Sequence, residues 1–204
     1  MGPRWNAARW GMALLALGAV CLQAWHLIQI DRFAILQFIS FFTIQSNVIA
    51  AVVMAIEAAG GLGIRPSRRE SLRGAVVLYL SITAIVYALL LSRLPIVKEI
   101  VHPWADPVLH YLVPLWVLID WLLAPITSII TFRRAMLWLV YPLGYLFVSL
   151  IRGALTGWYP YPFLNPNEPG GWLAVVIVCS ILTLLGVGLI WVIVWLKETR
   201  YAKR

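Results

Sequence analysis

A threonine and a histidine, each inside a long apolar segment, are the residues of this chain best suited to chemistry. Thr43 lies in segment 33–56, which has no charged residue but holds these polar ones: Gln37, Ser40, Thr43, Gln45, Ser46 and Asn47. His110 lies in the apolar segment 107–130. A hydroxyl beside an imidazole can transfer acyl groups, because the histidine takes the hydroxyl proton as the oxygen attacks an ester carbonyl. We therefore predict that Thr43 is a nucleophile and His110 its base.

The polar residues around Thr43 have two interpretations. Ser40, Thr43 and Asn47 are spaced three and four residues apart, so on a continuous helix they share one face. In the functional interpretation, Asn47, Gln45 or Ser46 supplies the hydrogen bonds that stabilise an oxyanion. In the structural alternative, the hydroxyls bond to carbonyls of their own helix and Asn47 bridges two helices.

The surroundings of His110 suit a base. Pro114 has no N–H to give to the His110 carbonyl, so the helix is expected to kink or hydrate beside the ring. The positive end of the helix dipole favours the neutral imidazole that a base needs. We expect Asp106, as the residue that caps this helix, or Asp31 and His26 to orient the ring. The alternative is an interfacial histidine held by hydrogen bonds.

Three further polar residues are candidates for contact with a substrate. Ser40 and Tyr145 can each donate a hydrogen bond from a hydroxyl group. Arg152 lies at the end of a predicted span, where it is expected either to pair with Asp31 or Glu168 or to hold a substrate carboxylate.

Asp120 is the acid placed deepest in a predicted span. It is ten residues beyond His110, which is about 15 Å along a helix axis and too far to orient the imidazole. We expect its carboxyl either to be protonated or to pair with a buried donor. A role in a proton relay is the alternative.

The composition predicts an integral membrane protein of the all-α class. Of the 204 residues, 62% are hydrophobic and 12% are charged, and the mean hydropathy is +0.89, whereas a soluble domain has about 25% charged residues. Because about 20 apolar residues span the hydrocarbon core, we expect six membrane crossings: 10–30, 33–56, 74–92, 107–130, 135–151 and 170–196. They should form a single domain, 1–204.

The net charge of +8 indicates topology rather than a nucleic-acid partner. Arg32, Arg93, Lys98 and Arg152 fall on one side of the predicted membrane, and the other basic residues fall on the side of the termini. The positive-inside rule then places both termini in the cytoplasm, with the basic residues near lipid headgroups. No basic surface lies outside these flanks, which argues against nucleic-acid binding. We expect neither a metal nor a cofactor.

In this topology the helices that carry Thr43 and His110 run in the same direction. Thr43 is about ten residues into its span and His110 about three, so their depths differ by roughly 10 Å before any tilt. The two residues can therefore meet in the outer leaflet. The loop 153–169 contains several prolines and aromatic residues, and it lies either over the site as a lid or at the interface as an aromatic belt.

The segments 41–47 (Phe-Phe-Thr-Ile-Gln-Ser-Asn), 110–114 (His-Tyr-Leu-Val-Pro) and 120–121 (Asp-Trp) resemble the androgen-induced-gene membrane protein family. The resemblance covers most of the chain and implies six spans in the same order. Animal members are threonine hydrolases that cleave fatty acid esters of hydroxy fatty acids. It implies a nucleophile at Thr43, an essential histidine at His110 and a lipid substrate that enters from the bilayer. The Pro-x5-Asp-Trp pattern is closer to microbial members, which implies a multi-pass protein of a microbial inner membrane.

Two other classes of function fit part of the pattern. A small-solute transporter or channel could use the polar face of segment 33–56. Against it, segments 74–92 and 170–196 carry no charge and the two halves of the chain show no repeat. A haem-binding electron carrier needs pairs of histidines in neighbouring spans, and the predicted spans contain only His26 and His110.

Overall fold

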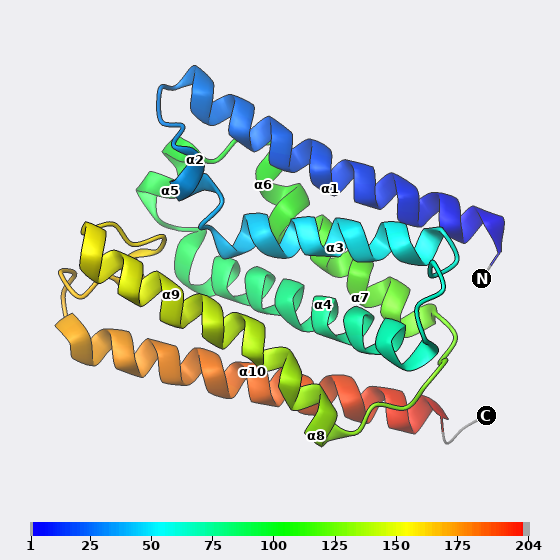
Figure 1. Ribbon diagram of the computed structural model, residues 1–204. Coiled ribbons are helices and arrows are strands. Elements are labelled where there is room, and N and C mark those ends of the chain that lie inside the picture. The colour runs from blue at the N-terminus through cyan, green and yellow to red at the C-terminus, as the bar shows by residue number, and fades with distance from the viewer. Residues whose placement is uncertain (1, 202–204) are drawn as a thin grey trace.

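The computed structural model describes residues 2–201, and in this range the chain folds into helices and connecting loops (Figure 1). In chain order the elements are α1 (Pro3–Gln29), α2 (Ile35–Phe38), α3 (Phe42–Ala58), α4 (Pro66–Val86), η1 (Tyr87–Leu91), α5 (Pro95–Ile100), α6 (Ala105–Pro107), η2 (Val108–Leu112), α7 (Val113–Leu123), α8 (Phe132–Ala135), η3 (Met136–Leu139), α9 (Val140–Thr156), η4 (Pro162–Leu164) and α10 (Gly171–Tyr201). The turns η1 and η2 are π-helical, and η3 and η4 are 3₁₀ turns. The predicted all-α class is confirmed.

Five helical stretches of the described chain are long and apolar enough to cross a membrane: Pro3–Gln29, Pro66–Leu91, Ala105–Leu123, Phe132–Thr156 and Gly171–Arg200. Helix α3 is also apolar but has 17 residues. Large apolar side chains point outward from these helices, including Leu155 at 80% exposure and Leu173 at 71%. An apolar surface of this extent is stable in lipid rather than in water. The chain is therefore an integral membrane protein.

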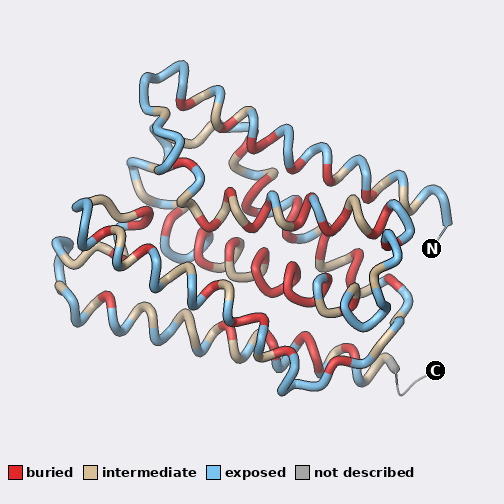
Figure 2. The backbone as a smooth tube through the Cα atoms, in the orientation of Figure 1, coloured by how far each residue is buried: buried red, intermediate tan, exposed pale blue. Residues whose placement is uncertain are grey.

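Helix α4 lies at the centre of the bundle (Figure 1). It contacts α3, α7 and α10, and α1 packs against α3. Residues 73–80 of α4 are all buried, as Figure 2 shows, which is typical of a helix surrounded by other helices. The two ends of the described chain lie at the same end of the bundle, the termini end. The opposite end is the distal end.

The predicted span 33–56 is not one helix. Helix α2 ends at Phe38, Phe41 is extended with φ −76° and ψ 127°, and α3 begins at Phe42. Thr43 is therefore the second residue of a helix rather than part of its middle. Ser40 lies outside α3, so the prediction that it shares a helical face with Thr43 and Asn47 is wrong.

The predicted span 107–130 also differs from the structure. The helix begins at Ala105 with Trp104 in the N-cap position, so the prediction that Asp106 caps it is wrong. It ends at Leu123, and residues 124–131 form a loop. The turn before Pro114 is π-helical, and this shift of the hydrogen-bond register by one residue bypasses the N–H that proline lacks.

The other four predicted spans are present as longer helices. Segments 10–30, 74–92, 135–151 and 170–196 correspond to helical stretches 3–29, 66–91, 132–156 and 171–201. At the termini end the helices extend beyond the apolar runs because charged residues there are buried with partners of opposite charge. Arg9 and Glu70, for example, are 4% and 1% exposed.

Candidate active site

Thr43 and His110 meet at the distal end of the bundle. The Thr43 Oγ1 atom lies 3.3 Å from His110 Nε2, and the histidine is 6% exposed. The proximity that the hydrolase hypothesis requires is therefore present. This distance permits a hydrogen bond from the threonine hydroxyl to a neutral imidazole, which is the arrangement of a nucleophile with its base.

Asp106 lies on the other side of the histidine ring. Its Oδ1 atom is 2.7 Å from His110 Nδ1, and its Oδ2 atom accepts a hydrogen bond of 2.6 Å from the Tyr87 hydroxyl. A carboxylate at Nδ1 holds the proton on that nitrogen and leaves Nε2 free to accept the proton of Thr43. Of the residues expected to orient the ring, the structure selects Asp106, whereas Asp31 is exposed beyond the end of α1.

Tyr87 is a site residue that the sequence did not indicate. Its ring stacks on the His110 ring, with the two centroids 3.6 Å apart and an angle of 11° between the planes. Tyr87 begins the π-helical turn η1, and His110 is in the π-helical turn η2. The two irregular turns thus bring the rings face to face, and the stacking fixes the imidazole plane toward Thr43.

Asn47 and Ser46 hold the helices together rather than point at a substrate. The Asn47 amide donates to the carbonyls of Thr43, at 2.9 Å, and Leu109, at 3.1 Å. The Ser46 hydroxyl lies 3.0 Å from Thr83 Oγ1 and 3.2 Å from the Thr43 carbonyl. Both residues have no exposed surface. The structural alternative describes them: Asn47 ties α3 to η2 and so sets the separation of Thr43 and His110.

Gln45 and Tyr145 support the break between α2 and α3. The Gln45 amide donates to the Ile39 carbonyl at 2.8 Å, and its oxygen accepts a hydrogen bond from Tyr141. The Tyr145 hydroxyl donates to the Ser40 carbonyl at 2.8 Å. Backbone carbonyls that lose their helical N–H partner within a membrane protein need other hydrogen-bond donors. These contacts assign both side chains to the backbone rather than to an oxyanion.

Arg152 has the same structural role. It donates to the Leu36 carbonyl at 2.9 Å and to the Ser40 hydroxyl. The Ser40 hydroxyl in turn bonds to the same Leu36 carbonyl. The predicted ion pair of Arg152 with Asp31 or Glu168 is therefore replaced by contacts to the broken backbone, and Ser40 belongs to the same support.

Tyr161 is the second site residue that the sequence did not indicate. Its hydroxyl oxygen accepts a hydrogen bond of 3.0 Å from the backbone N–H of Phe42, the residue before Thr43. Burial raises the pKa of this phenol, so it keeps its proton and can donate it. Tyr161 thus places a hydrogen-bond donor at the N-terminus of α3, where the helix dipole already favours negative charge.

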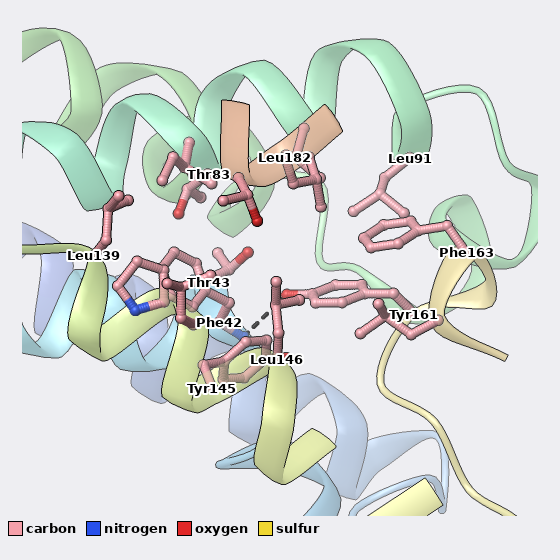
Figure 3. Close-up of a pocket in the computed structure, with 16 residues that line it drawn as sticks. Phe42, Thr43, Thr83, Leu91, Leu139, Tyr145, Leu146, Tyr161, Phe163 and Leu182 are labelled. Carbon is pink, nitrogen blue, oxygen red and sulfur yellow. Dashed lines mark hydrogen bonds between the residues drawn. The ribbon is translucent and has the colours of Figure 1, made fainter. Parts of the chain in front are cut away.

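Thr43 lies where two cavities meet. The larger, the vestibule, has a volume of about 420 Å³ and is lined by Thr43, His110, Arg32, Gln37, Asn165 and Glu168, among others. The smaller, the crevice, has a volume of about 60 Å³ and is lined mainly by apolar side chains such as Ile82, Val86, Leu143, Leu146 and Leu182 (Figure 3). Thr43 and Tyr161 line both cavities.

The loop after α9 forms one wall of the vestibule. Trp158, Tyr159, Asn165 and Glu168 from this loop all line that cavity. Gly153 lets the loop pack closely on α9, because a Cβ at this position would overlap the Tyr159 ring. The loop therefore forms part of the site, which is compatible with the lid alternative.

No family model, curated protein or solved structure matches this chain. The geometry of Thr43, His110 and Asp106 therefore carries the functional argument. Within residues 2–201 no three His, Cys, Asp or Glu side chains converge where a metal ion could bind.

Asp120 lies outside this site. Its Oδ1 atom accepts a hydrogen bond of 2.9 Å from Arg9 Nε at the termini end of the bundle, and its Oδ2 atom is 3.6 Å from Arg73 Nη2. Of the predicted alternatives, the structure shows a carboxylate paired with buried donors. The three acids considered with the site thus have separate positions, with Asp106 beside His110, Asp31 on the surface and Asp120 in an ion cluster.

Proposed function

We propose that this protein is an intramembrane lipid-ester hydrolase, with Thr43 as nucleophile, His110 as general base and Asp106 as the residue that orients His110. The observation that carries this proposal is the continuous contact from Asp106 through His110 to Thr43. The site opens into a cavity large enough for part of a lipid. Its proposed substrates are fatty acid esters of hydroxy fatty acids or similar long-chain esters.

The proposed reaction has two halves. The Thr43 oxygen attacks the ester carbonyl carbon while His110 Nε2 takes the hydroxyl proton, and the carbonyl electrons form an oxyanion. As the oxyanion collapses, the bond to the alcohol oxygen breaks and His110 returns the proton to that oxygen. The acyl group is then bonded to Thr43 Oγ1. Water attacks this new ester with His110 again as base, which releases the carboxylic acid and restores Thr43.

The surroundings of Thr43 support the charged steps. The oxyanion forms next to the first turn of α3, where the helix dipole places partial positive charge. The Tyr161 hydroxyl is placed to donate to it. Asp106 stabilises the imidazolium that exists after each proton transfer.

The topology of the proposed enzyme has six crossings. Helix α3 would be the sixth, because 17 residues at about 1.5 Å each approach the thickness of the hydrocarbon core. Both termini would lie in the cytoplasm, since the termini end carries most of the basic residues. The membrane would be a microbial inner membrane, and the active site would then lie in its outer leaflet.

The transporter alternative has less support from the structure. Beyond Asn47 the same side of α3 is closed by Ala50, Ala51 and Met54, which are 4% exposed or less. The polar residues of α3 therefore end in a packed core rather than continue as a path through the bundle.

The direct test of the proposed function is covalent labelling with a long-chain fluorophosphonate. We expect the probe to bond to Thr43 Oγ1, because the base beside this hydroxyl activates it. Peptide mapping by mass spectrometry would locate the label, and Thr43→Ala should remove it. Thr199, whose hydroxyl bonds to carbonyls of α10, provides the control in Thr199→Ala. A label that persists in Thr43→Ala would contradict the proposal.

Tyr161→Phe is expected to lower kcat for ester hydrolysis by about 10²-fold with little change in KM. Loss of one oxyanion donor acts on the transition state rather than on the bound substrate. The variant keeps the ring and its packing. Tyr111→Phe is the matched control, since Tyr111 lies next to His110 but is 46% exposed. An unchanged kcat in Tyr161→Phe would remove this residue from the mechanism.

A further inference from the structure

The two cavities that meet at Thr43 differ in character. The vestibule is lined by ionic and amide side chains, including Arg32, Gln37 and Glu168, as well as by apolar ones. The crevice lies among α3, α4, α9 and α10, and its polar lining is limited mainly to hydroxyl groups near Thr43 (Figure 3). An ester whose carbonyl carbon lies at Thr43 therefore has two different environments for its two arms.

The position of His110 indicates which part of the ester, the acyl chain or the alcohol, lies in which cavity. It lines the vestibule and is not among the residues that line the crevice. In the proposed reaction His110 must return a proton to the alcohol oxygen as that bond breaks, so the alcohol must leave on the side of His110. The acyl chain then lies on the opposite side of Thr43, where the crevice begins.

We propose that the crevice is the binding site of the acyl chain and the vestibule the site of the alcohol. This assignment rests on the proposed hydrolase function. When the acyl group is bonded to Thr43 Oγ1, its chain stays in the crevice while the alcohol departs through the vestibule. The same cavity then admits the water that hydrolyses the acyl-threonine, since His110 must take the proton of that water.

The crevice is closed toward the termini end. Leu139 lines it, and Gly186 of α10 lies so near that an added Cβ would be 2.8 Å from Leu139 Cδ2. A side chain at position 186 would therefore require the end of the Leu139 side chain to move. Because this end is filled by packed side chains, an acyl chain cannot continue through the bundle from there.

The crevice instead opens sideways toward lipid. Leu143 of α9 lines it and is 40% exposed. Leu146 of α9 and Leu182 of α10 line it as well. A chain with its carbonyl at Thr43 therefore passes Leu146 and Leu182 and leaves between α9 and α10 into the bilayer.

A matched pair of tryptophan variants on α10 tests this assignment. Leu182 lines the crevice, whereas Leu184 is 70% exposed on the same helix. Leu182→Trp should lower kcat/KM for p-nitrophenyl palmitate by at least about 10-fold and change that for p-nitrophenyl acetate by less than about twofold, because only the long chain needs the filled space. Leu184→Trp should behave as the wild type on both esters.

A second pair on α9 repeats the test if Leu182→Trp does not fold. Leu146 lines the crevice and Phe147, its neighbour, is 66% exposed. Leu146→Trp is expected to discriminate against the palmitate ester in the same way, and Phe147→Trp is not. Equal losses on palmitate and acetate, or no loss in either crevice variant, would overturn the assignment.

Photo-crosslinking separates this inference from the proposed function. A palmitoyl ester with a diazirine near the carbonyl end of its acyl chain, in the part that would lie in the crevice, is expected to label α4, α9 or α10 in the wild type, and less in Leu182→Trp. Labels on the vestibule residues Tyr159 or Asn165 instead would overturn the assignment. If Thr43→Ala hydrolyses esters as fast as the wild type, the proposed function fails, whereas crosslinks within the crevice would still identify it as a site for an acyl chain.

Discussion

Alanine at Thr43 or at His110 is expected to lower kcat/KM for a long-chain ester by about 10⁴-fold or more, and the double variant should lose no more. The two side chains act as a unit, since the Thr43 hydroxyl is 3.3 Å from the nitrogen that would take its proton. Once either group is absent, the other has no step to perform. Initial rates on p-nitrophenyl palmitate, with the protein in lipid nanodiscs, measure this non-additivity.

Two controls accompany these variants. Thr199→Ala removes a threonine hydroxyl from α10, and His26→Ala removes the histidine that packs edge-on against His102. Both should keep the wild-type rate. Thr43→Ser retains a hydroxyl and should remain measurably active. Losses that add in the double variant would mean that Thr43 and His110 act in separate steps, contrary to the mechanism.

The geometry of the site depends on irregular backbone at three places. The turns η1 and η2 face each other, so that Tyr87 stacks on His110 and bonds to Asp106. The break before Phe42 puts Thr43 in the first turn of α3. Regular helices at these places would point the same side chains elsewhere. Strained or irregular backbone often occurs at functional sites, where it fixes the geometry of the side chains although it lowers the stability of the fold.

The sequence could predict that Thr43 and His110 lie close together, because a polar side chain exposed to lipid costs free energy and is therefore expected to face another polar group inside the protein. Each lies in an apolar segment, and two helices with the same direction bring their beginnings to the same end of a bundle. The predicted depth difference, roughly 10 Å on regular helices, is absent for a local reason. Since α3 begins at Phe42, Thr43 is in the first turn of its helix, close to the level of His110.

The break itself could not be predicted from its own residues. Segment 33–56 contains no glycine or proline, the residues that end helices by their local chemistry. Instead Arg152 and Tyr145, more than 100 positions away, and Gln45 bind the carbonyls that the break releases. A tertiary effect of this kind is invisible in the local sequence. The same residues were predicted to bind substrate because polar groups in a membrane are commonly functional.

The sequence did not predict Tyr87 and Tyr161 as site residues, for different reasons. Tyr87 lies in an apolar segment, where tyrosine is a common residue of membrane helices. The π-helical turn that begins at Tyr87 has no signal in the local sequence. Tyr161 is one of several aromatic residues in a proline-rich loop. Its contact with Phe42 depends on how that loop folds back over α3.

Asp120→Ala is expected to destabilise the folded protein by about 3–5 kcal/mol, because it leaves buried cations without their acid. The Asp120 carboxylate accepts hydrogen bonds from Arg9 and from the Trp5 indole, and Arg73 lies 3.6 Å away. Neither arginine is more than 6% exposed. Thermal unfolding in a fixed detergent, followed by intrinsic tryptophan fluorescence, measures the loss.

The charged side chains at the termini end form one cluster, which is why the expected loss of stability is large. Its acids are Glu57, Glu70 and Asp120, and its bases are Arg9, Arg69, Arg73 and Lys197. Helices α1, α3, α4, α7 and α10 each contribute to it. The basic residues that the sequence assigned to topology therefore include several that hold the bundle together. An unpaired charge there is costly because neither lipid nor a packed core can solvate it.

A second substitution shows whether the unpaired charge causes the loss. Arg9→Met in the Asp120→Ala background removes one of the unpaired cations, so the double variant should be more stable than the sum of the two single losses predicts. Glu198→Ala, at an exposed acid of α10, should change stability by less than about 0.5 kcal/mol. Additive losses would mean that Arg9 and Asp120 stabilise the bundle independently.

The same variants decide between the structural role of Asp120 and the proton relay. Asp120 belongs to the termini end and Thr43 to the distal end, so the folded fraction of Asp120→Ala should hydrolyse esters with wild-type kcat. A structural acid lowers the melting temperature and leaves the turnover of folded molecules unchanged. An acid that relays protons to His110 would do the opposite, since kcat would fall while the melting temperature stayed the same. The ion pair with Arg9 favours the first outcome, because it holds the Asp120 carboxyl group at the termini end, away from His110.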